Sequence, residues 1–185
     1  MTHHASRHRK RYAGSDHALK PADAVGKRFI DRTRLAGRDF VHIHPGDIHY
    51  SAQPTAISTL LGSCVAVCLW DPEVGVGGIT HYVLPDSFGR GEFSTRFGRV
   101  AVSVLVENLA ALGASIPRLM AKIVGGGNVV SAIPAEGSVG ERNIVLARSL
   151  LADLAIPVVS EDTGGTSGRV LVFFTDNGVA LVRKV

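Results

Sequence analysis

The sequence predicts an α+β protein with roughly seven or more strands, most of them antiparallel, and two main helices. Short runs of β-branched and aromatic residues, separated by turn sequences, predict hairpins. Two longer segments repeat apolar residues at helical spacing. No apolar run approaches the roughly eighteen residues that span a membrane, so we expect no membrane insertion. A chain of 185 residues is long enough for one domain with a substantial core.

The N-terminal segment differs in charge from the rest of the chain. Residues 1–38 hold ten Lys/Arg and three Asp, a net charge of +7, whereas the remainder holds ten Lys/Arg and thirteen Asp/Glu, a net charge of −3. We therefore predict a basic, disordered arm over residues 1–36 and a single domain over residues 37–185. No recognition helix or aromatic ladder accompanies the arm, which argues against a specific nucleic-acid partner. It also lacks the apolar segment of a secretory signal, which favours a cytoplasmic protein.

The first predicted strand covers residues 40–44, which alternate in polarity and end at Pro45. His42 and His44 share one face of this strand, and His49 follows shortly after. Three histidines without a second pair of ligands or a Cys-x-x-Cys motif make a poor zinc site. We predict no metal and no organic cofactor.

A β-hairpin is predicted for residues 64–84, with its turn at residues 71–75. A four-residue loop there places Cys64 directly opposite His81, on one face of the hairpin. A thiol and an imidazole in that arrangement suit a nucleophile and its general base. A bulge at Gly77 would instead turn His81 to the other face. A free cysteine in an apolar strand is more often a small core residue, so the structural interpretation stays open beside the catalytic one.

The residues before Cys64 supply further candidates for a catalytic site. Gly62 is able to adopt a backbone conformation that other residues avoid. The backbone N–H groups of Gly62, Ser63 and Cys64 could then hold an oxyanion. Ser58 and Thr59 lie six and five residues before the thiol, and either hydroxyl could orient the imidazole.

The two cysteines, Cys64 and Cys68, are too far apart in one strand for a disulfide. Four residues of strand span about 13 Å, whereas the Cα atoms of a disulfide lie roughly 4–7 Å apart. We predict two free thiols in a reducing cytoplasm.

Two helices are predicted after the hairpin. Residues 95–112 form the first, with Ser94 or Thr95 as the N-cap and Gly113 just past its end. The capping box at residues 138–141 opens the second helix, which stops before the proline at position 157.

The remaining segments are short strands and loops. Strands are predicted at residues 119–124, 158–159 and in a C-terminal hairpin over 169–183. The glycine-rich segment 125–128 lacks a nucleotide-binding motif, and we interpret it as close backbone packing beside the site. Loops at residues 86–93 and 163–168 are candidate borders of a substrate cleft.

Four motifs in the chain resemble the CheD family of chemoreceptor glutamine deamidases. They are residues 58–69 with His81 seventeen residues after Cys64, residues 124–128, residues 139–143 and residues 162–169. The resemblance covers about residues 38–185. It implies that Cys64 is the nucleophile and His81 the general base. It also implies a hydroxyl that supports the histidine, for which spacing favours Ser58 and residue type favours Thr59.

The resemblance implies a fold and a function as well. The expected fold is a layered β-sandwich with two main helices packed outside. The expected activity is conversion of specific glutamines of methyl-accepting chemotaxis receptors to glutamate, and a thioester mechanism would also permit hydrolysis of receptor methyl esters. A CheC-type phosphatase is a further expected partner. Two alternatives remain: a binding module for the receptor or for CheC whose catalysis is incidental, and a general thiol hydrolase or peptidase.

Overall fold

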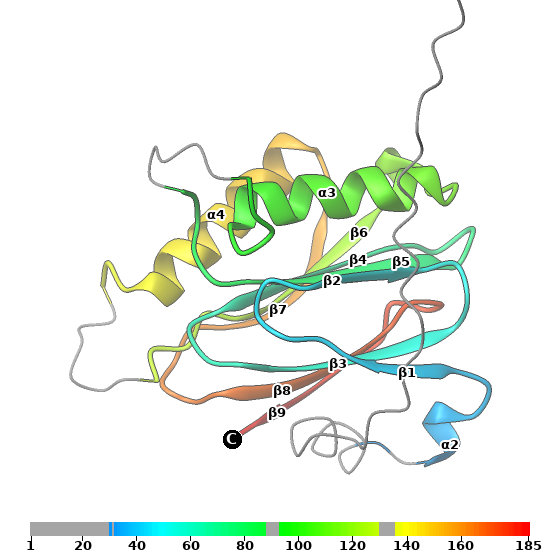
Figure 1. Ribbon diagram of the computed structural model, residues 1–185, viewed down its shortest axis with the longest axis horizontal. Coiled ribbons are helices and arrows are strands. Elements are labelled where there is room, and N and C mark those ends of the chain that lie inside the picture. The colour runs from blue at the N-terminus through cyan, green and yellow to red at the C-terminus, as the bar shows by residue number, and fades with distance from the viewer. Residues whose placement is uncertain (1–29, 31, 88–92, 130–135) are drawn as a thin grey trace, which may run out of the picture.

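The computed structural model describes residues 30, 32–87, 93–129 and 136–185. Their elements form three layers (Figure 1), with helices α3 (Gly98–Ala111) and α4 (Val139–Asp153) over one face of a five-stranded sheet. A four-stranded sheet covers the opposite face of the five-stranded one. The predicted α+β class, with a layered sandwich and two outer helices, is confirmed.

The five-stranded sheet contains the predicted hairpin at its centre. Its spatial order is β2-β5-β4-β6-β7, and all neighbours are antiparallel except β6 and β7. The strands are β2 (Ile48–Ser51), β4 (Val65–Asp71), β5 (Val76–Tyr82), β6 (Met120–Gly125) and β7 (Val158–Thr163).

The four-stranded sheet joins segments from both ends of the chain, in the order β1-β3-β8-β9. Only β1 and β3 are parallel. The strands are β1 (Asp39–His42), β3 (Thr55–Leu61), β8 (Arg169–Phe174) and β9 (Ala180–Lys184). Neither β2 nor β3 was predicted as a strand.

Two apolar layers hold the structure together. The layer between the helices and the five-stranded sheet includes Leu105, Leu109 and Ile123. The layer between the two sheets includes Ile57, Leu171 and other buried side chains. Each fully buried aliphatic side chain contributes about 1.5–3 kcal/mol, so the spacing of the two sheets is fixed by the second layer.

The register of the central hairpin differs from the predicted one by two residues. Trp70 pairs with Gly77, so His81 lies opposite Ala66 and not opposite Cys64. The pairing runs without a bulge through Gly77. Asp71 continues the strand because Ser115 and Arg118 bind its carboxylate, and the turn starts one residue later. A shift of two residues preserves the face, so Cys64 and His81 still share one.

The start of α3 corrects another prediction. The N-cap residue is Phe97, and no side chain caps the helix. Thr95 instead donates its hydroxyl to the carbonyl of Gly46 at 2.6 Å, and the Ser94 hydroxyl accepts from the Arg96 N–H at 3.3 Å. Both predicted caps therefore bind loops before the helix begins.

The other helix signals are confirmed. Gly113 follows α3 with a φ angle of 100°, which a glycine adopts without strain. Ser138 caps α4 by accepting from the Glu141 N–H at 3.2 Å. The Glu141 carboxylate accepts from the N–H of Gly137. Within the described ranges, no helix is both long and apolar enough to cross a membrane.

Part of the range assigned to the N-terminal arm packs on the domain. Helix α2 (Arg32–Leu35) precedes β1, and Ile30 is buried in a small apolar cluster with Ala56 and Phe174. This cluster lies on the far face of the four-stranded sheet (Figure 1). Residues 1–29 lie outside the described residues, so for them the disordered arm stays a prediction.

Candidate active site

Thr59 and His81 form a hydrogen bond that joins the two sheets. Thr59 lies on β3 between Ile57 and Leu61, whose side chains belong to the inter-sheet core, so its hydroxyl faces the same space. His81 projects into that space from β5. Thr59 Oγ1 lies 2.7 Å from His81 Nδ1, and both residues are only 1% exposed.

The hydroxyl of Thr59 determines which nitrogen of His81 carries the proton. Thr59 Oγ1 donates its single hydrogen to the carbonyl of Ile43 at 2.9 Å. It must therefore accept from His81 Nδ1–H. In the neutral imidazole this leaves Nε2 as an unprotonated acceptor. His81 Nε2 is buried and has no hydrogen-bond partner among the described residues.

The environment of His81 keeps its imidazole neutral. Burial, with smaller contributions from His42 and His44, lowers the pKa of His81 to about 4. The main chain of His81 is held as well, because its carbonyl accepts from the Gly46 N–H at 2.6 Å and its N–H donates to the Asp47 carbonyl at 3.0 Å. The result is an oriented base with a free lone pair on Nε2.

Cys64 precedes β4 directly and lies beside His81. It is half-buried and packs against the inter-sheet core. Ala66 is opposite His81, and Cys64, two residues before Ala66 and just outside the strand, packs into the same inter-sheet layer. Burial raises the pKa of the Cys64 thiol, while Arg96 and the amide of Cys64 itself lower it in part. Both Cys64 and Cys68 are free cysteines, as predicted.

The loop from Gly62 to Cys64 is held through its carbonyl groups. The Gly62 carbonyl accepts from Gly127 N–H at 2.8 Å and the Cys64 carbonyl accepts from Gly126 N–H at 2.8 Å. The Ser63 carbonyl accepts from the side-chain amide of Asn143 at 3.1 Å. No cis peptide occurs in the described chain, and in a trans peptide the N–H points away from the C=O. The Ser63 and Cys64 N–H groups therefore point away from these partners.

The expectation that Gly62 would use a backbone conformation that other residues avoid is wrong. Its φ angle lies outside the left-handed region. A Cβ atom there would come within 3.4 Å of the Val129 side chain, which is an ordinary contact. The loop is shaped by its hydrogen-bonded carbonyls instead.

The glycine-rich segment 125–128 provides the close backbone packing that was predicted. Gly125 has a φ angle of 113°, and a Cβ atom there would lie 2.3 Å from the Cys64 carbonyl oxygen. Gly126 has the same role towards α4, where a Cβ would lie 2.5 Å from Ile144. The missing side chains let this segment bind the loop before Cys64 on one side and α4 on the other.

Ser58 does not contact His81. Its hydroxyl lies 2.8 Å from Nδ1 of His42, because successive residues of a strand face opposite sides of the sheet. The rings of His42 and His44 meet edge to face, with centroids 4.9 Å apart. Within the described residues, no group of three or more His, Cys, Asp or Glu is arranged to hold a metal ion.

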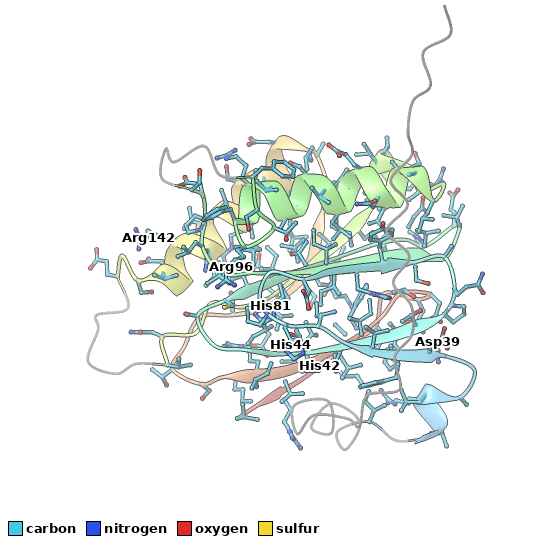
Figure 2. The ribbon with its side chains drawn as sticks, viewed as in Figure 1. Asp39, His42, His44, His81, Arg96 and Arg142 are labelled. Atoms are coloured by element: carbon cyan, nitrogen blue, oxygen red, sulfur yellow. The ribbon has the colours of Figure 1, made fainter. Side chains whose placement is uncertain are left out.

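Two arginines lie near the end of the five-stranded sheet that carries His81. Figure 2 shows Arg96 and Arg142 on the same side of His81, towards the beginning of α4. Arg96 is exposed, and its aliphatic chain covers Gly46, where a Cβ would come within 2.9 Å of it. Its guanidinium is the charge that lowers the Cys64 pKa.

Asn143 is the residue that the sequence analysis did not identify as part of the site. It is fully buried near the beginning of α4, and its Nδ2 donates both to the Ser63 carbonyl and to the Val83 carbonyl, the latter at 2.9 Å. Its place in the motif of residues 139–143 was a usable signal. An amide at a buried helical position needs polar partners, and these come from segments that only the fold brings together.

The sequences of known proteins match most of this chain. A family model described as CheD chemotactic sensory transduction matches residues 83–184. The probable chemoreceptor glutamine deamidase CheD 1 of Anaeromyxobacter dehalogenans is 48% identical over 149 residues, covering 80% of this chain and 86% of that protein. The probable chemoreceptor glutamine deamidase CheD of Trichlorobacter lovleyi is 43% identical over 142 residues, covering 77% of this chain and 88% of that protein.

Among solved structures the similarity is more distant. The hypothetical protein YfiH of Bacillus licheniformis aligns with a TM-score of 0.48 and 16% identity, over 78% of this chain and 69% of that one. The extent and identity of the sequence matches establish that the chain belongs to the CheD family.

Proposed function

We propose that this protein is a protein-glutamine deamidase that converts glutamine side chains of chemoreceptors to glutamate. The observation that supports it best is the buried His81, whose Nδ1–H is bound to Thr59 and whose Nε2 is unpartnered on the face that carries Cys64. This is the geometry of a base for a thiol nucleophile. The names of the relatives supply the substrate class.

In the first half-reaction, Cys64 Sγ attacks the carboxamide carbon of the glutamine. The thiol proton passes to His81 Nε2, because both groups are neutral before the attack: burial raises the pKa of Cys64 and lowers that of His81. The carbonyl oxygen becomes an oxyanion, which the N–H groups of Ser63 and Cys64 stabilise. His81 Nε2–H then gives its proton to the leaving nitrogen, the C–N bond breaks, and ammonia leaves a thioester on Cys64.

The second half-reaction reverses the roles. Water gives a proton to His81 Nε2 and attacks the thioester carbon. The C–S bond breaks, the proton returns to the Cys64 sulfur, and glutamate is released. Thr59 keeps the imidazole in the tautomer that both halves need. The same thioester can form from a glutamate methyl ester, with methanol as the leaving group, so we expect methylesterase activity on receptors too.

Two further expectations for this chain follow from the family resemblance. A CheC-type phosphatase is the predicted regulatory partner, and the cytoplasm is the predicted compartment. Both stay predictions, and co-purification from cells would test the first of them.

The first test is mass spectrometry of a purified chemoreceptor signalling domain after incubation with the protein. We expect a gain of about one dalton at defined glutamines and release of ammonia, because an amide becomes a carboxylate. The Cys64→Ala variant should produce neither change. Peptides that span each modified glutamine identify the sites.

Three outcomes would contradict this proposal. Cleavage of the receptor chain would indicate a peptidase. A mass gain that persists with Cys64→Ala would show that another group carries the reaction. Receptor binding without any mass change, in the presence and absence of a CheC-type protein, would favour a binding module.

A further inference from the structure

We propose that Asn143 is a positioning residue for the oxyanion site, because its side chain fixes the Ser63–Cys64 peptide so that the Cys64 N–H faces the reacting carbonyl. This inference rests on the proposed thiol mechanism but does not depend on which substrate is bound. It assigns a function to a buried residue of α4 that does not itself touch the reacting atoms.

The contacts of Asn143 join the nucleophile and the base through one amide group. Its Nδ2 donates to the Ser63 carbonyl at 3.1 Å and to the Val83 carbonyl at 2.9 Å. Ser63 directly precedes Cys64, and Val83 lies two residues after His81. A single NH₂ group therefore holds the backbone of the nucleophile at a fixed position relative to the strand of the base.

The geometry of the Ser63–Cys64 peptide links this contact to the side of the loop where the reaction is proposed to occur. The Ser63 carbonyl and the Cys64 N–H belong to one planar trans peptide and point in opposite directions. A hydrogen bond from Asn143 to the carbonyl therefore fixes the direction of the N–H on the other side. It also polarises the peptide and strengthens the N–H as a donor. The same amide also lowers the pKa of the Cys64 thiol in part.

The two acceptors also explain why the residue is an asparagine. Two carbonyl oxygens facing one amide require its NH₂ group, because a flipped amide would bring its oxygen against both of them. The Oδ1 atom of Asn143 is buried without a partner in the described part of the chain. An unsatisfied buried acceptor costs stability, and the two hydrogen bonds from Nδ2 offset that cost.

The position of Asn143 is itself tightly fixed. The Tyr82 hydroxyl donates to the Asn143 carbonyl at 2.6 Å. Gly140, one turn before, lies so close to Gly126 that a Cβ would come within 2.5 Å of its carbonyl oxygen. Helix α4 therefore presents the amide from a rigid support, which a positioning residue needs.

The test compares two reactions of the same thiol. Acylation of Cys64 by p-nitrophenyl acetate forms an oxyanion, whereas alkylation by iodoacetamide forms none. We expect Asn143→Asp and the neutral Asn143→Ser to lower the acylation rate constant about 100-fold, as misplacement of a catalytic group does. The alkylation rate constant should fall far less, because it loses only the small lowering of the thiol pKa by the Cys64 amide. The matched control is Val145→Ala, which truncates an exposed side chain two residues further along α4 and should leave both rates unchanged.

Each outcome of these rate measurements either supports or overturns the role proposed for Asn143. Unchanged acylation in both Asn143 variants would overturn the inference, as would a parallel fall of acylation and alkylation, because a general loss of structure has that signature. A wild-type thiol that is alkylated but never acylated would also overturn it. If Asn143→Asp does not fold, as judged by its thermal melt, Asn143→Ser gives the answer. Wild-type acylation without receptor deamidation would reject the proposed function alone.

Discussion

At the scale of single residues, Thr59 and Ser58 are neighbours with different surroundings. Thr59 faces the inter-sheet space and binds His81, and Ser58 faces the other side of β3 and binds His42. The hydroxyl of Thr59 also donates to Ile43, so it can only accept from the imidazole. A valine at this position would keep the shape but remove both interactions.

We expect Thr59→Val to lower kcat for deamidation about 100-fold with little change in KM, because the imidazole would lose its orientation and its preferred tautomer. Steady-state kinetics of ammonia release measure this. Ser58→Ala is the matched comparison and should have a much smaller effect. The reverse ranking would show that Ser58, and not Thr59, supports His81.

The sequence predicted Cys64 and His81 as candidate site residues but could not decide between the two hydroxyls. That decision needs the direction of alternation in β3, and this strand was not predicted. Asn143 was not predicted as a site residue for a related reason. The carbonyl groups of Ser63 and Val83 that accept its hydrogen bonds are 80 and 60 residues away in the chain. Local pattern shows that a residue is polar, not what it binds.

At the scale of elements, Asp71 links the central hairpin to the segment after α3. Its side chain is fully buried and accepts from the Ser115 N–H at 2.8 Å and from Arg118 Nη2 at 2.8 Å. The N–H of Glu73 in the hairpin turn donates to it at 3.0 Å. This carboxylate therefore closes the end of β4 and fixes the turn.

The pH dependence of stability should reveal this link. Burial alone would raise the pKa of Asp71, but Arg118 and the amides of Ser115 and Glu73 outweigh it and lower the pKa from 3.8 to about 2. The ionised form therefore contributes stability above about pH 4, and the contribution is lost as the pH falls towards 2. We expect Asp71→Asn to lower the free energy of unfolding by about 1–2 kcal/mol at pH 7, since Arg118 is partly exposed.

Denaturant unfolding of the wild type and the variant at pH 7 and near pH 2 measures this difference, which should shrink at the lower pH. The control is Glu73→Gln. Glu73 pairs with the same arginine but is 68% exposed, so this change should alter stability little at either pH. A deficit in Asp71→Asn that is equal at both pH values would show that the charge of Asp71 contributes nothing.

The prediction of helices, strands and turns was most accurate where the sequence signal lies within a few neighbouring residues. The capping box of α4, the glycine after α3 and the turn of the hairpin are each contained within a few residues. The register of the hairpin was not, because Asp71 is kept in β4 by residues more than forty positions later. The N-cap of α3 failed for the same reason, since Thr95 binds Gly46 instead.

At the scale of the whole molecule, the candidate site is shared between the two sheets. Thr59 comes from the four-stranded sheet, whereas His81 belongs to the five-stranded one and Cys64 directly precedes its strand β4. The distance between Thr59 and His81 therefore depends on the core between the sheets. The fold class was predictable from the pattern of elements, but the division into sheets was not. Strand β3 pairs with β8, more than one hundred residues away, and local sequence carries no record of that pairing.

Substitutions of two buried leucines should distinguish an effect on stability from an effect on catalytic activity. Leu171 lies in the core between the sheets, and Leu109 lies between the helices and the five-stranded sheet; both are 0% exposed. We expect Leu171→Ala and Leu109→Ala each to cost about 2–5 kcal/mol of stability. At a temperature well below both melting points, only Leu171→Ala should lower kcat, because it alone loosens the sheet spacing. Equal losses of kcat in the two variants, measured well below both melting points, would contradict the idea that the site depends on the spacing of the sheets.

The loop before Cys64 has a consequence for how mutagenesis of this enzyme would be interpreted. If its oxyanion donors are the N–H groups of Ser63 and Cys64, every amino acid except proline supplies the donor at position 63. An alanine scan through the loop would then pass over Ser63 without effect. The phenotype would appear instead at Asn143, whose side chain holds the Ser63 carbonyl, and at Gly127, where a Cβ would come within 2.8 Å of the Ser167 carbonyl oxygen. Catalytic sensitivity would thus map to positions remote in sequence, while the residue next to the nucleophile tolerates substitution.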